Sequence, residues 1–348
     1  ILSLAAVLML AVTFGVSASA SQESVDADLE FVTVTNYVMG NPPTNGQLEA
    51  VEEEVNKILK EKINAHTKVQ WIEWADWYTK YNLLLASGQE LDLIHTSSTW
   101  LDFWPNVQRG AFMALDDLIP KYAPLTWEEI PQIDWEQTKY EDKIYCFPEN
   151  DYTQYVNHGV FYRGDFLKEF GMDPVNSFEE LGAYFQKVKD TKEGVYPFDV
   201  NPGFDLFFRG WFQSETDYIE VPVSTGRARV VYAKSFDDYT NLFCPVFEDS
   251  YLTYTKMMKE WSDAGYWRKD VLNYTGDTRD ALRAGTSASD SHHTNTFRTL
   301  KKEIETRYIP GADLQFFAYS ETRKNLVAEP ITHGGTGIAR NAANPERA

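Results

Sequence analysis

The amino-acid sequence predicts an α/β fold with a parallel sheet in its first part and a second lobe after it. Between residues 29 and 100, segments with strand and helix patterns alternate in the order strand, helix, strand, helix, strand. A helix must carry the chain back between neighbouring parallel strands, so this order favours parallel pairing. The 348 residues exceed one typical domain, which indicates two lobes.

Each expected strand is followed by a loop that carries rings, hydroxyls or carboxylates. The carboxyl ends of parallel strands share one edge, where open α/β sheets bind their ligands. We therefore expect Tyr37, Trp74 and Trp100 to line a site for a polar ligand with apolar faces, together with Ser97. The alternatives are that the rings pack in the core and that Ser97 caps the next helix. The expected strands are 29–35, 69–73 and 91–94.

Two amphipathic helices are expected between these strands. Residues 44–47, Thr-Asn-Gly-Gln, match a capping box that predicts the start of the first helix. The second helix is expected from about Asp76 to Gly88, a residue suited to a left-handed C-cap. The first helix would place five apolar residues on one face: Leu48, Val51, Val55, Ile58 and Leu59.

The second part of the chain begins with a short expected strand at 159–163. Ser177 and Glu180 form another capping box, which predicts a helix that starts after Ser177. The polar segment 150–157 has no helix period, so we place the boundary between the lobes there.

The first 20 residues have the pattern of a secretory signal peptide. Residues 1–16 are uncharged and almost wholly apolar, and Ala18-Ser19-Ala20 provides a small-x-small cleavage site. A membrane anchor is the alternative, but the run is shorter than the roughly 20 residues that a spanning helix needs. No lipid-accepting cysteine follows the run. We expect an exported protein, extracellular or at the cell surface or periplasmic, that is released and not lipid-anchored.

The end of the sequence resembles the start of a helix. Asn344 is a cap residue, Pro345 would occupy the first turn, and Glu346 stands beside it. The helix that this pattern predicts does not follow, so we expect the chain to be truncated at its C-terminus.

Composition limits the kinds of partner that this protein can have. The formal net charge is −20, which disfavours nucleic acid and anionic membranes as partners. Aromatic residues make up 15% of the chain, and rings stack well on the C–H faces of sugars. The alternative is that most of these rings lie in the core. Cys146 and Cys244 are the two cysteines, and the sequence is equally compatible with a disulfide between them and with two free thiols.

Several segments, taken in their order and spacing, resemble the family 1 extracellular solute-binding proteins of ABC importers. The resemblance is to the aromatic-rich branch common in Firmicutes and, more distantly, to maltose-binding protein. It implies a type II periplasmic-binding-protein-like flytrap of two α/β lobes, each a mainly parallel sheet flanked by helices. The segments that carry the resemblance are 54–63, 77–88, 91–94, 145–150, 162–171, 282–288 and 337–348.

The resemblance also implies how the chain is divided. The hinge would be crossed near 152–158 and again near 332–338. We accordingly expect a signal peptide and three further parts: 1–20 as the signal peptide, 21–154 as the first part of the N-lobe, 155–334 as the C-lobe, and 335–348 as the truncated return to the N-lobe.

Further ligand-binding candidates follow from the resemblance. Glu149, Asp151 and Tyr152 match a segment that supplies carboxylate acceptors and a stacking tyrosine in maltose-binding protein. The alternative is a solvated acidic loop. Trp211 resembles the aromatic residue of the second lobe that stacks on sugar, and a place in the core is its alternative.

His292, His293 and Asn295 follow a predicted strand, in a loop that faces the cleft in relatives. Adjacent histidines also suggest a metal site. Neighbours in a strand point to opposite faces and do not easily share one ion, so we expect no metal here.

Together these observations predict a non-enzymatic receptor. It would capture a carbohydrate, most simply an oligosaccharide, by hinge closure and deliver it to an ABC transporter membrane permease. We expect no cofactor, no nucleic-acid partner and a monomer. The alternatives are a secreted glycoside hydrolase that uses the Glu149 and Asp151 carboxylates, and a peptide-binding receptor of the same fold.

Overall fold

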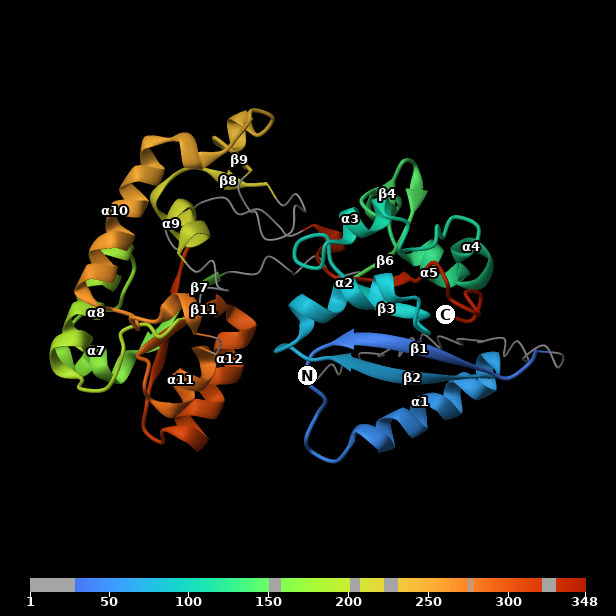
Figure 1. The fold of residues 1–348 in the computed structure, drawn as a ribbon, viewed down its shortest axis with the longest axis horizontal. Helices are drawn as coiled ribbons and strands as arrows, with labels where there is room; N and C mark the ends of the chain where they lie inside the picture. Colours follow the sequence, from blue (N-terminus) through green and yellow to red (C-terminus); the bar gives the residue numbers. More distant parts are fainter. Residues whose placement is uncertain are drawn as a thin grey trace, which may run out of the picture.

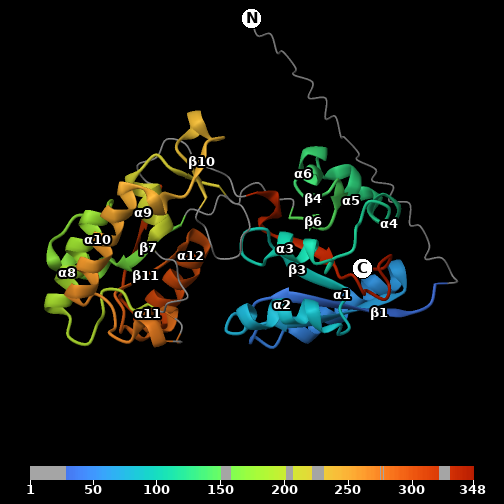
Figure 2. The ribbon, with the colours of Figure 1, turned by 45° about the horizontal axis from the view of Figure 1, so that its top comes forward.

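The computed structural model describes residues 29–149, 158–200, 207–221, 231–274, 276, 278–320 and 330–348. These residues form two α/β lobes that lie side by side in both views (Figures 1 and 2). The first lobe contains the first described residues, from Leu29 on, and the last residues of the chain, and the second contains the middle. The two-lobed α/β fold expected from the sequence is confirmed. The predicted limits of the lobes stay a proposal, and most of the first predicted crossing, 152–158, falls outside the described residues.

The first lobe is built on a mixed five-stranded sheet with the order β2-β1-β3-β13-β6. β1 pairs in parallel with both β2 and β3, as the alternation of strands and helices predicted. β13 comes from the end of the chain and inserts antiparallel between β3 and β6. The strands are β1 Val32–Met39, β2 Ala65–Ile72, β3 Leu93–Thr96, β6 Phe147–Pro148 and β13 Gly335–Ile338.

The first helix of this lobe runs beside β2 (Figure 1), where the side chain of Asn56 bonds both backbone groups of Thr67. The predicted capping box is wrong. Gln47 is the N-cap residue, and its backbone N–H donates to Asn45 Oδ1 at 3.1 Å, so a local asparagine turn precedes the helix. The helices and the small hairpin of the lobe are α1 Leu48–Ile63, α2 Trp77–Ser87, α3 Phe103–Gln108, α4 Ile119–Tyr122, α5 Pro124–Glu129, α6 Gln132–Glu136, β4 Lys139–Tyr140 and β5 Lys143–Ile144.

The second lobe is built on an antiparallel sheet of the order β11-β7-β12. The expectation of a mainly parallel sheet is therefore wrong for this lobe, although β11 and β12 run in the same direction. Helix α12, Thr294–Glu303, returns the chain between them, but β7 lies in the middle and opposes both. A strand and helix order does not reveal which strands become neighbours. The strands are β7 His158–Arg163, β11 Ser289–His293 and β12 Leu314–Ala318.

Alternate residues of β7 supply two different cores. Val160 and Tyr162 pack with α8 and α10, whereas Phe161 packs with Leu282 of α11 and with the helix after β11. Both faces of the sheet are thus covered, as Figure 1 shows. The helices are α7 Gly164–Phe170, α8 Phe178–Thr191, α9 Phe208–Glu215, α10 Asp249–Ala264 and α11 Thr278–Ala284, and a π-helical turn, Ile304–Tyr308, extends α12.

The predicted cap of the second-lobe helix is confirmed. Ser177 Oγ accepts the backbone N–H of Glu180 at 3.1 Å and caps α8.

Cys146 is buried, Cys244 is half-buried, and both are free thiols. A third, small sheet has the order β10-β9-β8, and its strands are β8 Ile219–Glu220, β9 Tyr232–Ala233 and β10 Leu242–Phe243. In the described part of the chain, no helix combines the length and the apolar character needed to cross a bilayer.

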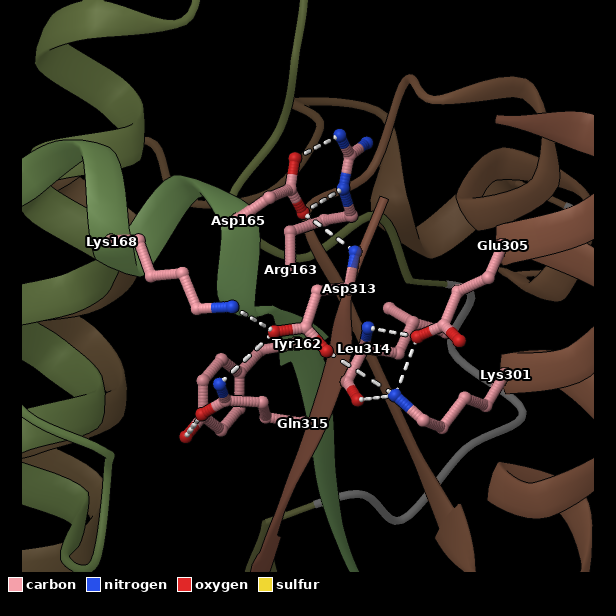
Figure 3. Close-up of polar contacts among 9 residues, drawn as sticks. All are labelled: Tyr162, Arg163, Asp165, Lys168, Lys301, Glu305, Asp313, Leu314 and Gln315. Atoms are coloured by element: carbon pink, nitrogen blue, oxygen red, sulfur yellow. Dashed lines mark hydrogen bonds and ion pairs between the residues drawn. The ribbon is translucent and has the colours of Figure 1, made fainter. Parts of the chain in front are cut away.

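A polar network holds the end of β7 to the start of β12 (Figure 3). Arg163 makes two hydrogen bonds to the carboxylate of Asp165, at 2.7 and 2.5 Å. Asp313 accepts from Lys168 at 2.8 Å and from Lys301 at 3.3 Å, which ties α7 and α12 to the same strand. These charges lie in a structural junction at the carboxyl end of β7.

Candidate ligand-binding site

Three tryptophans gather at the carboxyl ends of β2 and β3. The Trp100 ring lies 5.8 Å from Trp74 and 5.6 Å from Trp77, measured between ring centroids. We call these three residues the tryptophan cluster. Trp74 is 50% exposed, and Trp100 is half-buried against the core, so part of the aromatic surface faces solvent.

The loops after β1 and β2 hold Trp74 in place. The backbone N–H of Trp74 donates to Asn41 Oδ1 at 3.2 Å. Gly40 adopts φ +130°, a conformation that favours glycine, and a Cβ there would stand 3.7 Å from the rings of Trp71 and Trp74. The edge of the sheet thus presents a tryptophan that is fixed by two neighbouring loops.

Polar groups lie next to the tryptophan cluster. His95 comes from β3, and its ring centroid is 5.8 Å from that of Trp100. Glu149 Oε1 is 4.0 Å from His95 Nδ1. The carboxylate of Glu149 lies over Gly334, where an added Cβ would stand 2.1 Å from its carboxyl carbon. A small residue at 334 therefore lets Glu149 approach His95.

The imidazole of His95 is uncharged at neutral pH. Burial, together with the charge that His333 would carry, lowers its pKa from 6.5 to about 4. A neutral imidazole has one donor and one acceptor nitrogen, which suits a hydroxyl group that also does both.

The segment that re-enters the first lobe is bonded to the loop after β3. Thr99 Oγ1 lies 2.7 Å from His333 Nδ1, and Thr332 Oγ1 donates to Ser98 Oγ at 2.8 Å. Ser98 N–H also donates to the Thr332 carbonyl at 2.9 Å. His333, in the short helical turn Ile331–His333, is therefore fixed beside the tryptophan cluster.

Two residues of this lobe that the sequence predicted as ligand contacts, Ser97 and Tyr37, make contacts within the lobe. Ser97 is fully buried, and its hydroxyl accepts the N–H of Thr99 at 3.1 Å, so it shapes the turn after β3. Tyr37 lies within β1, which extends to Met39, and it packs against the core. These contacts favour the packing alternatives that the sequence left open.

In the second lobe, three imidazoles gather where β7 begins and β11 ends. The His292 and His293 ring centroids are 4.1 Å apart, and each lies 5.9 Å from His158. The strand ends at His293 and α12 begins at Thr294, so the expected opposite orientation of the two neighbours is wrong. In the regions that the structure covers, no group of three or more His, Cys, Asp or Glu is placed to hold a metal ion.

The first turn of α12 orients these rings. The Thr296 N–H donates to His293 Nδ1 at 3.2 Å, which makes this imidazole the cap of the helix. His292 Nδ1 lies 2.8 Å from Thr296 Oγ1. Asn295 is exposed in the same turn. Helix α12 lies on the side of the second lobe that faces the first (Figures 1 and 2).

The electrostatic surroundings keep His293 neutral as well. Burial lowers its pKa to about 4, and the charges of Arg279 and His333 act in the same direction. Arg209 of α9 reaches His158, with Nη1 3.4 Å from Nδ1, and its guanidinium pairs with the buried carboxylate of Glu220. The charge of His333 lowers the pKa of both His95 and His293.

The remaining candidates divide into two groups. Trp211 is 7% exposed and packs among Phe212 and Tyr254, which favours its core alternative. Asp151 and Tyr152 lie outside the described residues. Thus the structure brings together Trp74, Trp100 and Glu149 in one lobe and His292, His293 and Asn295 in the other.

Sequence reasoning missed the polar residues His95, His158 and His333. His95 is inside the third strand, whereas His158 and His333 lie at the ends of the two predicted hinge crossings. Their positions could have indicated them. His95 is one residue from the end of β3, and His158 and His333 lie at the predicted crossings between the lobes.

Comparisons with known proteins agree with this architecture. The family described as bacterial extracellular solute-binding protein matches residues 42–289. A carbohydrate ABC transporter substrate-binding protein of Streptococcus pneumoniae serotype 4 is 25% identical over 252 residues, which are 72% of this chain and 47% of that protein. The chain thus spans about half the length of that relative.

Two solved structures show the same fold. The N-glycan transport solute-binding protein NgtS of Streptococcus pneumoniae, in complex with Man5GlcNAc, has a TM-score of 0.68 and 20% identity, and the match covers 91% of this chain and 65% of that one. Lmo0181 from Listeria monocytogenes, in complex with cycloalternan, has a TM-score of 0.62 and 15% identity, and the match covers 92% and 74%. The family match extends over more than half of the sequence and the expected resemblance is confirmed: the chain belongs to the bacterial extracellular solute-binding proteins.

Proposed function

We propose that this chain is the ligand-binding portion of a carbohydrate receptor that serves an ABC importer. It would capture an oligosaccharide between its lobes and present it to a membrane permease. The observation that carries the proposal is the tryptophan cluster at the ends of β2 and β3, with His95 and Glu149 beside it.

The chemistry of this surface suits a sugar. Aromatic rings offer flat apolar faces to the C–H groups of a pyranose, while imidazole and carboxylate groups bond its hydroxyls. Each hydroxyl that leaves water needs such a partner, because an unpaired buried polar group costs about 1–3 kcal/mol. Rings and polar groups side by side meet both requirements.

The named relatives support the carbohydrate class. The relative from Streptococcus pneumoniae is described as a carbohydrate ABC transporter protein, and the two solved structures hold Man5GlcNAc and cycloalternan. All three concern oligosaccharides or carbohydrate transport, and we extend that class to this chain.

Hinge closure is the proposed mechanism. A sugar that contacts the tryptophan cluster alone has no preference between open and closed forms. A sugar that also contacts His292 and Asn295 gains those interactions only when the lobes approach, so it shifts the population toward the closed form. The permease would recognise that form.

We further propose that the receptor acts outside the cytoplasm, as a monomer and without a catalytic role. Residues 1–20 would serve as the export signal, and the lobes would divide at 154/155 and 334/335. Asp151 and Tyr152 stay proposed contacts from the first crossing.

A thermal-shift screen tests the proposal. The panel contains Man5GlcNAc, maltotriose, a mixed peptide library and buffer alone, because a compound that binds the native state raises the melting temperature. We expect an oligosaccharide to raise it and the peptides to leave it unchanged. A shift with peptides alone would favour the peptide receptor. Release of reducing sugar from the same oligosaccharides, abolished in Glu149→Gln, would instead identify a glycoside hydrolase.

A further inference from the structure

Trp100 joins the rings of the tryptophan cluster, but its own backbone and indole do little to fix it. Its ring contacts those of Trp74, Trp77 and His95, at centroid distances of 5.8, 5.6 and 5.8 Å. The hydrogen bonds found in the described part of the chain include none to Trp100 itself. Its place in the loop after β3 therefore depends on ring packing and on how its neighbour Thr99 is held.

Hydrogen bonds on both sides hold Thr99. Its Oγ1 lies 2.7 Å from His333 Nδ1 and 3.2 Å from Ser97 Oγ, and Ser97 Oγ also accepts the Thr99 N–H at 3.1 Å. The residues next to this pair are bonded as well. Ser98 N–H donates to the Thr332 carbonyl at 2.9 Å, and Thr332 Oγ1 donates to Ser98 Oγ at 2.8 Å. The loop that carries Trp100 is thus attached to the segment that carries His333.

The buried hydroxyl of Ser97 sets the direction of these bonds. Ser97 is fully buried, so its own proton needs an acceptor, and among the described residues Thr99 Oγ1 is the hydroxyl oxygen beside it. The hydroxyl of Thr99 then donates to His333 Nδ1, which must be unprotonated. An acceptor nitrogen at residue 333 is therefore what holds the Thr99 side chain.

His333 belongs to the segment by which the chain returns from the second lobe. The preceding strand, β12, lies in the sheet of the second lobe, whereas β13 begins at Gly335 in the sheet of the first. Ile331 N–H donates to Gln137 Oε1 at 3.3 Å, so the same segment is also bonded to a second part of the first lobe. The place of Trp100 therefore depends on a segment far along the chain that connects the two lobes.

We propose that His333 is a positioning residue of the sugar site, and that through Thr99 it holds Trp100 in the orientation that stacks on a sugar ring. This inference rests on the proposed function, since it concerns the same site. A ring that is fixed before binding loses little conformational freedom when the sugar arrives, whereas a loop that must first be ordered weakens the affinity. His333 thus contributes to binding through Thr99 and Trp100.

Isothermal titration calorimetry of the full chain with Man5GlcNAc and with maltotriose measures this contribution. Thr99→Val keeps the shape of the side chain but removes the hydroxyl, and His333→Phe keeps a ring but removes the acceptor. We expect each variant to raise Kd about threefold to tenfold, the effect of losing one hydrogen bond. The melting temperature should fall by at most about 4 °C, because the bonds between Ser98 and Thr332 remain.

Conservative variants test whether the hydrogen bond is the cause. Thr99→Ser keeps a hydroxyl, and His333→Asn keeps an acceptor oxygen close to the place of Nδ1, so both should bind like the wild type. Thr67→Val is the matched control. Thr67 is a half-buried threonine near the start of β2, and its hydroxyl donates to the Val34 carbonyl at 3.4 Å. We expect it to leave Kd unchanged.

Crystal structures of sugar-free Thr99→Val and Thr99→Ser show the position of the ring directly. We expect the Trp100 ring to move away from Trp74 and Trp77 in Thr99→Val and to keep its place in Thr99→Ser. A ring that keeps its place in Thr99→Val overturns the positioning role.

The outcomes of the titrations separate this inference from the proposed function. Sugar binding by the wild type with the same Kd in Thr99→Val and His333→Phe overturns the inference and leaves the carbohydrate receptor intact. A loss of affinity that Thr99→Ser and His333→Asn share also overturns it, because the hydrogen bond is then not the cause. An absence of binding by the wild type with either sugar overturns the proposed function and this inference together.

Discussion

Trp74 shows most clearly how single residues prepare the proposed site. Its backbone is fixed by Asn41, its ring contacts Trp100, and half of its surface is exposed. An anchored ring with a free face loses little conformational freedom when a sugar stacks on it. Trp74 should therefore contribute more to the free energy of sugar binding than to the free energy of folding.

We predict that Trp74→Ala weakens oligosaccharide binding by about tenfold or more, since full burial of an aromatic side chain stabilises by about 1.5–3 kcal/mol. Calorimetric Kd values measure the change. Tyr122→Ala is the matched control, because Tyr122 is 47% exposed, close to the 50% of Trp74, and lies on α4 of the same lobe. Equal affinity of the two variants would contradict a binding role for Trp74.

Gly334 gives a second prediction at this scale. In Gly334→Ala the new Cβ would stand 2.1–2.2 Å from the Glu149 carboxylate, whose flexible, half-exposed side chain can turn away. We expect a loss of less than about 1 kcal/mol in stability but a several-fold weaker sugar affinity. Glu149→Gln, measured in the same titrations, shows the effect of the carboxylate charge alone. A wild-type affinity in Gly334→Ala would exclude Glu149 as a sugar contact.

Single residues were predicted unevenly from the sequence. Trp74 and Trp100 follow strands, and the structure places both at the expected edge. Tyr37 does not follow its strand, because β1 continues to Met39. His333 contacts a loop 234 residues earlier in the chain, and no local pattern reports such a separation.

Among the elements, the junction of β7, α7 and β12 shows how the second lobe is held together (Figure 3). The Arg163 side chain is 9% exposed, and its guanidinium also lies over the Phe166 ring at 4.1 Å. Burial would raise the pKa of Asp165, but the hydrogen bonds and charge of Arg163 outweigh it and lower that pKa. The hydrogen bond from Lys168 lowers the pKa of Asp313.

We predict that Asp165→Asn destabilises the protein by about 2–3 kcal/mol at neutral pH, because it leaves the buried Arg163 without its counter-charge. Urea unfolding measures the difference. Asp263→Asn is the control, since Asp263 forms an exposed pair with Lys259 that is worth at most about 0.5 kcal/mol.

The same pair predicts a pH dependence. A carboxyl group with a lowered pKa contributes stability above its unfolded pKa of about 4 and loses it as the pH falls through the folded value. The difference in the free energy of unfolding between the wild type and Asp165→Asn should therefore shrink below about pH 4. A difference that is undiminished at about pH 2.5 would show that the carboxylate charge is not its source.

The order of elements was predictable where neighbours in sequence are also neighbours in space. β1, β2 and β3 follow this rule, and their parallel pairing was expected. In the second lobe β7 lies between two strands that are more than 120 residues further along the chain, so local patterns gave the strand at 159–163 but not its antiparallel partners.

At the scale of the whole molecule, the return of the chain at β13 makes the first lobe from two distant segments. β13 pairs with β3 and β6, and the adjoining turn carries His333 to the tryptophan cluster. The length of the chain and its resemblance to a family predict two lobes, but they do not identify the ligand. The class of ligand follows from the side chains at the site.

The central claim is that one oligosaccharide contacts the tryptophan cluster of the first lobe and the end of β11 in the second. A crystal structure of the chain with the sugar selected by the thermal-shift screen tests it most directly. We predict a sugar ring stacked on Trp74 or Trp100, with hydroxyls within hydrogen-bond distance of His292, His293 or Asn295. A sugar that contacts one lobe only, or that lies away from both groups, would contradict the account.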